Sequence, residues 1–198
     1  KSEQFTTCPL LHICAIHTLS TKPFRNLAKL IIMPHLPTAE EKHTTYKDTL
    51  ARIDALLQGE TDWIAAMATV ACELHHSFEH FHWTGFYRHV EQNNLIIGPY
   101  QGHHGCLHIH FTRGVCGAAA LQRATQLIEN VHNIPHHIAC SSTTVSEIVV
   151  PLVLPNHDVL AVLDVDSDDH AAFDEIDQHY LEDLCQKLVE QFGHTTQR

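Results

Sequence analysis

The stretch that decides the fold lies between residues 146 and 165. Residues 146–154 read Ser-Glu-Ile-Val-Val-Pro-Leu-Val-Leu, and residues 159–165 read Val-Leu-Ala-Val-Leu-Asp-Val. Both runs are rich in the branched apolar residues that favour strands, and the Pro-Asn-His-Asp between them is a turn sequence. Strands joined by a short turn pair antiparallel. The sequence therefore predicts a β-hairpin within an antiparallel sheet.

Outward from this hairpin, apolar spacing predicts helices at both ends of the domain. Tyr46, Leu50, Ile53 and Leu57 recur at helical spacing, and Asp62 is a suitable N-cap for a second helix. Three strands, a further helix and a last helix are expected at residues 81–90, 95–100, 104–111, 115–123 and 173–192. The predicted fold class is α+β, with helices packed against a central antiparallel sheet.

The 198 residues suffice for one cored domain of about 150 residues with an appendage. We expect the domain at residues 45–198 and an N-terminal extension at residues 1–44. The extension is poor in acids, weakly basic and interrupted by prolines. It is read as a disordered extension, with an organelle-targeting segment as the alternative.

Composition excludes several classes of function. The net charge of −11 argues against binding nucleic acid phosphates. Because no run of about 20 apolar residues occurs, no membrane span is expected. Seven cysteines are an odd number in a chain too long to need disulfide staples. Free thiols in a reducing compartment are therefore expected, and the cytoplasm is the predicted location.

Three of these cysteines, Cys106, Cys116 and Cys140, lie mid-domain beside small or flexible residues. Cys116 also begins a predicted helix, where the helix dipole would favour a thiolate. Cys140 lies in a loop, as many nucleophiles do. Burial as small apolar side chains is the alternative for any of them, and it is the preferred interpretation of Cys72 and Cys185.

A second candidate cluster is acidic. Glu147 begins one strand of the hairpin, while Asp164 and Asp166 end the other. Alternation places the two aspartates on one face, and antiparallel pairing brings Glu147 beside them. Three adjacent carboxylates repel one another, so at least one pKa should rise. Such a cluster suits binding an ammonium group or donating a proton; a solvated strand end is the alternative.

Two weaker features remain. Trp83 and Tyr87 share one strand face and could wall an apolar pocket, although strand aromatics are usually core. Residues 103–110 carry four histidines around Cys106, and His104, Cys106, His108 and His110 alternate along the expected strand. Imidazole and thiolate are zinc ligands, but no ligand spacing typical of zinc sites is present, so no metal is expected.

Taken together, the segments resemble the free methionine-(R)-sulfoxide reductases, which consist of a single GAF domain. The matching stretches, in the family's order, are residues 83–87, 95–102, 113–117, 137–140, 146–152 and 163–167. The resemblance implies a GAF fold and reduction of free L-methionine (R)-S-oxide to L-methionine, an antioxidant activity. It implies no cofactor, with thioredoxin as the external reductant and a homodimer as one possible assembly.

The resemblance also implies a role for each candidate residue. Cys140 would be the nucleophile, Cys106 the resolving thiol, and Cys116 an accessory or alternative partner. The substrate-binding carboxylates map onto Glu147, Asp164 and Asp166, and the pocket for the methyl-sulfinyl group onto Trp83 and Tyr87. The sequence departs from the family at His136 and Ser141, where the family has Gly and Asp.

Two other classes of function compete with the reductase. GAF domains also serve as non-catalytic sensors of small ligands, and fold alone does not decide between these roles. Three placed cysteines are unexplained by sensing, and no output domain is visible. A His/Cys metal-binding module is the other alternative.

Overall fold

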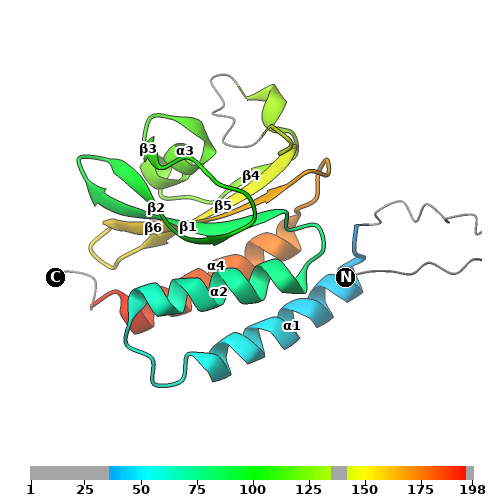
Figure 1. Ribbon diagram of the computed structural model, residues 1–198, viewed down its shortest axis with the longest axis horizontal. Helices are drawn as coiled ribbons and strands as arrows, with labels where there is room; N and C mark the ends of the chain where they lie inside the picture. Colours follow the sequence, from blue (N-terminus) through cyan, green and yellow to red (C-terminus); the bar gives the residue numbers. More distant parts are fainter. Residues whose placement is uncertain (1–35, 135–141, 195–198) are drawn as a thin grey trace, which may run out of the picture. The chain divides into compact units, whose positions relative to one another are not determined.

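The computed structural model describes residues 36–134 and 142–194, in which helices cover both faces of one six-stranded sheet (Figure 1). The order is α1 (Ala39–Leu56), α2 (Trp63–Ser77), β1 (Trp83–Glu91), β2 (Asn94–Gln101), β3 (His108–His110), α3 (Gly114–Gln122), β4 (Gln126–Ile128), a 3-10 turn η1 (Val131–Asn133), β5 (Ser146–Val153), β6 (Val159–Ser167) and α4 (Glu175–Phe192). All strand pairs are antiparallel, in the order β3-β2-β1-β6-β5-β4. The predicted α+β class is confirmed.

The two faces of the sheet carry separate apolar cores. Helices α2 and α4 pack on one face with α1 outside them, while α3 covers the other face (Figure 1). The core under α3 includes Trp83, Tyr87 and Cys116. The predicted hairpin forms as β5 and β6, and it contributes alternate residues to both cores. None of the helices in the described ranges has the combined length and apolarity that crossing a bilayer requires.

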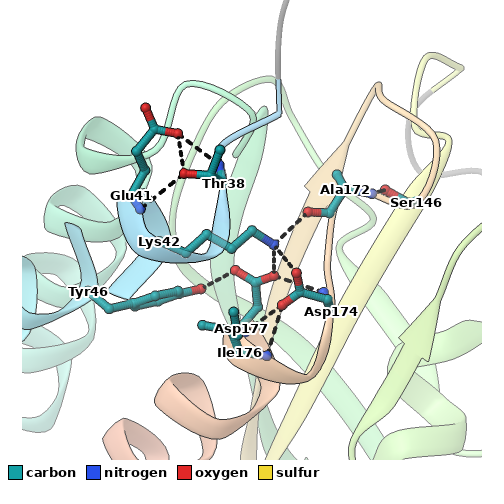
Figure 2. Close-up of polar contacts among 9 residues, drawn as sticks. All are labelled: Thr38, Glu41, Lys42, Tyr46, Ser146, Ala172, Asp174, Ile176 and Asp177. Atoms are coloured by element: carbon teal, nitrogen blue, oxygen red, sulfur yellow. Dashed lines mark hydrogen bonds and ion pairs between the residues drawn. The ribbon is translucent and has the colours of Figure 1, made fainter. Parts of the chain in front are cut away.

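Helix α1 begins earlier than its apolar stripe predicts. It starts at Ala39 instead of near Tyr46, because Thr38 and Glu41 form a capping box. Figure 2 shows that Lys42 then reaches into the fold, where its ammonium contacts the carboxylates of Asp177 and Asp174. The helix therefore extends across the predicted boundary at residue 44; the division of the chain into extension and domain stays a prediction.

The same buried lysine ties α1 to the segment that follows β6. Its ammonium also donates to the carbonyl oxygen of Ala172, at 3.2 Å (Figure 2). The Ala172 N–H donates to the hydroxyl of Ser146, which in turn donates to the carbonyl of Asp169 at 2.7 Å. Ser146 is the first residue of β5, so the start of this strand is fixed to the chain that leaves β6.

The strand predicted at residues 104–111 is wrong in extent. Only His108–His110 pairs with β2, where the last backbone contact is the Ile97 N–H donating to the Leu107 carbonyl. The next N–H on that edge of β2 would belong to Pro99, which has none, so the ladder stops. His104 and Cys106 consequently lie in the preceding loop, and the four alternating His and Cys residues do not share a strand face.

Candidate active site

The hairpin brings the three predicted carboxylates together. Glu147 on β5 pairs with Asp166 on β6. Asp164 lies two residues before Asp166 and therefore on the same face of the sheet. Glu147 and Asp164 are both buried and share a hydrogen bond between their carboxyl groups. Asp166 is half-buried at the strand end. Three acids thus occupy one small region between β5, β6 and α3.

Burial changes the protonation of this cluster. It raises the pKa of Asp164 to about 7, although hydrogen bonds with Cys116 and Glu147 act in the opposite direction. The pKa of Glu147 rises well above its usual range, through burial first and then through the charges of Asp164 and Asp166. Burial and the neighbouring aspartates raise the pKa of Asp166 as well. The cluster therefore retains protons at neutral pH, which a solvated strand end would not.

Cys116 joins the cluster from α3. Its thiol donates a hydrogen bond to the Asp164 carboxylate, with Sγ and Oδ2 3.2 Å apart. Cys116 is a free cysteine and is 4% exposed. Burial, followed by the charges of Asp164 and Glu147, raises its thiol pKa well above the usual value. The expected activation by the helix dipole is therefore overcome, and Cys116 is a neutral thiol at neutral pH.

The ligand atoms of Cys116, Glu147 and Asp164 lie within 4.8 Å of one another, a spacing that a metal ion could bridge. Metal ligands must be deprotonated, however, and burial favours the protonated form of all three groups. A metal ion at this position would therefore have to displace protons from these groups. The histidines of residues 103–110 do not belong to this group.

An aromatic pocket opens beside the carboxylates. Trp83 stacks on Tyr87 and on Tyr100, with ring centroids 5.7 and 5.4 Å apart. The Trp83 indole N–H donates to the carbonyl of His103 at 2.8 Å, which fixes the ring against the following loop. The pocket measures about 500 Å³. Its described lining consists of His82, Trp83, Tyr87, His103, His104, Gly105, Ser142, Thr143, Thr144, Asp164, Asp166 and Asp168.

The loop between β2 and β3 closes over these rings at Gly105. A Cβ added there would lie 2.8 Å from the Tyr87 hydroxyl and 3.2 Å from the Trp83 ring, so only glycine allows this approach. The next residue is Cys106, which is disulfide-bonded. Its disulfide thus begins one residue from the pocket wall. Cys140, the predicted nucleophile, lies outside the described residues.

The chain is similar to known proteins of the GAF-domain family. Residues 59–189 match the model of the GAF domain. A free methionine-R-sulfoxide reductase from Saccharomyces cerevisiae is 36% identical over 75% of this chain and 85% of its own length. A crystal structure of the Neisseria meningitidis free methionine-R-sulfoxide reductase in complex with its substrate aligns with a TM-score of 0.74 and 38% identity, over 82% of this chain and 96% of that one. The chain belongs to the GAF-domain family of free methionine-R-sulfoxide reductases.

Membership confirms the resemblance read from the sequence. The family also has neighbours described differently: a putative GAF sensor protein from Burkholderia vietnamiensis is 38% identical, with a TM-score of 0.74, over 79% of this chain and 99% of that one. Overall similarity is thus equal for a reductase and a putative sensor. Within this GAF family, the residues of the site must decide the function of a given member.

Sequence reasoning did not single out His82 and Asp168, which line the pocket, or Tyr100, which stacks on Trp83. Tyr100 extends the aromatic stack, and Asp168 adds an acid one residue beyond β6. His82 directly precedes β1, and its ring Nδ1 accepts the N–H of Asp168 at 3.0 Å. Tyr100 pairs with Gly85 across β1 and β2, and His82 directly precedes the predicted Trp83. Adjacency to Trp83 was the available signal for His82.

Proposed function

We propose that this protein reduces free L-methionine (R)-S-oxide to L-methionine by thiol chemistry. The observation that carries the proposal is the contact between an aromatic pocket and a proton-holding carboxylate cluster. Trp83 and Tyr87 present apolar faces that suit the methyl-sulfinyl end of the substrate. Asp164 and Asp166 line the same pocket, and the buried Glu147 is hydrogen-bonded to Asp164. The substrates named for the family's reductases support this assignment.

The first chemical step is assigned to Cys140. Its thiolate attacks the sulfur of the sulfoxide while a protonated carboxyl group of the cluster donates its proton to the sulfoxide oxygen. The hydroxyl group then moves to the Cys140 sulfur as the new sulfur–sulfur bond and the substrate's sulfur–oxygen bond both break, so that methionine leaves as the thioether and Cys140 becomes a sulfenic acid. Burial and both neighbouring aspartates favour the protonated form of Glu147, so the cluster holds a proton for this step.

The second step regenerates the site. The Cys106 thiol attacks the sulfenic acid, forms the disulfide and releases water. Participation of Cys106 is supported by its disulfide-bonded state and by its place next to Gly105 in the pocket wall. A thioredoxin-like dithiol then reduces the bond. The free state of Cys72, Cys116 and Cys185 fits a reducing compartment, which supports the cytoplasm as the setting.

Cys116 receives an accessory role in this scheme. Its protonated thiol donates to Asp164 and thereby favours the negative charge of that carboxylate, which can hold the substrate's ammonium group. A neutral, buried thiol is a poor nucleophile, so Cys116 is not assigned the attack. A homodimer stays a prediction of the family resemblance.

A stereospecific activity assay tests the proposal. The purified protein, with thioredoxin, thioredoxin reductase and NADPH, should consume free L-methionine (R)-S-oxide and leave the (S)-epimer unreduced. Cys140→Ser should abolish turnover, whereas Cys72→Ser, outside the pocket, should retain it. A ligand sensor predicts binding without turnover, and that result would exclude the reductase.

Two further variants assign the remaining thiols. Cys106→Ser should still release one equivalent of methionine per protein in a single turnover but should form no disulfide. If a disulfide still forms in Cys106→Ser, Cys116 is the resolving thiol instead. Cys116→Ser should keep multiple turnovers, because serine retains a donor to Asp164.

A further inference from the structure

A free amino acid presents a problem of charge to this pocket. Its ammonium group finds carboxylates, but its own α-carboxylate enters the space that Asp164, Asp166 and Asp168 line, where each ionised acid would repel it. An anion entering such a site needs a fixed N–H or O–H donor. The described lining offers hydroxyl donors on Tyr87, Ser142 and Thr144 and imidazole donors on its three histidines.

The imidazole of His82 is held in the state that provides one. The backbone N–H of Asp168 donates to its Nδ1 at 3.0 Å, and the Ser167 hydroxyl lies 3.4 Å from the same atom. A backbone N–H can only donate, so Nδ1 must carry its lone pair. In a neutral imidazole the proton then resides on Nε2. His82 thus offers an N–H donor from a ring whose other nitrogen is fixed.

The position of His82 is fixed as well as its tautomer. Its backbone N–H donates to the carbonyl of Asp166 at 2.9 Å, which locks the residue beside the carboxylate cluster. The side chain is exposed and lines the pocket, and Nε2 has no hydrogen-bond partner among the described residues. His103 and His104 also line the pocket, but no described hydrogen bond fixes their rings.

We propose that His82 recognises the α-carboxylate of the substrate by donating a hydrogen bond from Nε2, and so helps to select the free amino acid. This inference rests on the proposed function. It makes the pocket dipolar, with carboxylates for the ammonium group on one side and an imidazole donor for the carboxylate on the other. A methionine sulfoxide inside a peptide has no free carboxylate at this carbon and would not receive the contact.

The test compares two substrates in the wild type and in His82→Ala. One is L-methionine (R)-S-oxide; the other is L-methioninol (R)-S-oxide, in which a hydroxymethyl group replaces the carboxylate. For the acid, His82→Ala should raise KM by about ten- to a hundredfold, the range for a hydrogen bond to a charged group, with kcat nearly unchanged. For the alcohol, KM should change by less than about threefold. If the wild type does not turn over the alcohol, its competitive inhibition constant takes the place of KM.

His82→Asn is the conservative variant. Its amide oxygen can accept the Asp168 N–H while its NH₂ group donates, so it should recover most of the affinity for the acid. His179→Ala, which removes an exposed histidine on α4, is the matched control and should behave as wild type. Equal losses for acid and alcohol, or no loss for either, would overturn the role of His82. Absence of any wild-type turnover of the acid would instead overturn the proposed function.

Discussion

Replacing Asp164 with asparagine should flatten the dependence of stability on pH. The folded protein holds a proton on Asp164 up to about pH 7, compared with an ordinary pKa of 3.8 in an unfolded chain. Between these two values the folded state binds more protons than the unfolded state, so the free energy of unfolding must fall as pH rises. A difference of about 3 pKa units corresponds to about 4 kcal/mol lost between pH 4 and pH 8.

Asp164→Asn should remove this loss of stability with rising pH, because the ionising group is gone. Asparagine keeps an oxygen that can accept the Cys116 thiol hydrogen, but it does not ionise. The charge of Asp164 also contributes to the raised pKa of Glu147 and Asp166, so their share of the slope should decrease too. At pH 8 the variant should therefore gain roughly 4 kcal/mol on the wild type, relative to their difference at pH 4.

The measurement is urea unfolding of both proteins, without ligand, at several pH values from 4 to 8 and with the disulfide state held constant. Asp48→Asn, an exposed aspartate on α1, serves as the control and should follow the wild-type curve. Parallel pH curves for the wild type and Asp164→Asn would show that Asp164 is ionised in the folded state throughout, and the reasoning about the cluster would be refuted.

Two other substitutions test features of the fold and pocket. Lys42→Met should lower the free energy of unfolding by about 3–5 kcal/mol, because it leaves the fully buried carboxylate of Asp177 without its cation. Adding Asp177→Leu should restore part of this lost stability. An unchanged urea midpoint in Lys42→Met would contradict a stabilising role for the ion pair. Gly105→Ala should raise KM for the sulfoxide by roughly tenfold, because its methyl group would press on Tyr87 and Trp83. Tyr87→Phe in the same chain removes the contacted oxygen and should relieve the effect, whereas a normal KM in Gly105→Ala would show that the loop adjusts freely.

The parts of the fold that the sequence predicted correctly follow from local periodicity. The β5–β6 hairpin is specified by its apolar runs and its turn, and period-two alternation alone places Asp164 and Asp166 on the same face. The position of Glu147 opposite Asp166 then follows from antiparallel pairing. For this reason the sequence alone predicts the carboxylate cluster.

The errors arise where distant segments decide the outcome. The length of β3 is limited by Pro99 on the neighbouring strand, and the early start of α1 depends partly on a buried partner on α4 for Lys42. The local sequence around Cys116 indicates a lowered thiol pKa, but carboxylates from β5 and β6 raise it. Hydrophobic periodicity does not identify His82 as a site residue. Its tautomer is set by the backbone N–H of Asp168, which follows β6 and is distant in the sequence.

The buried cysteines have a consequence for the durability of a catalyst that meets oxidants. Thiolates, not thiols, are the form that peroxides attack. Burial raises the pKa of Cys185 on α4, as burial and carboxylates do for Cys116. Both sulfurs are thereby shielded from oxidation, whereas Cys106 is disulfide-bonded. In the proposed reaction, Cys106 and Cys140 would therefore be oxidised before the buried Cys116 and Cys185.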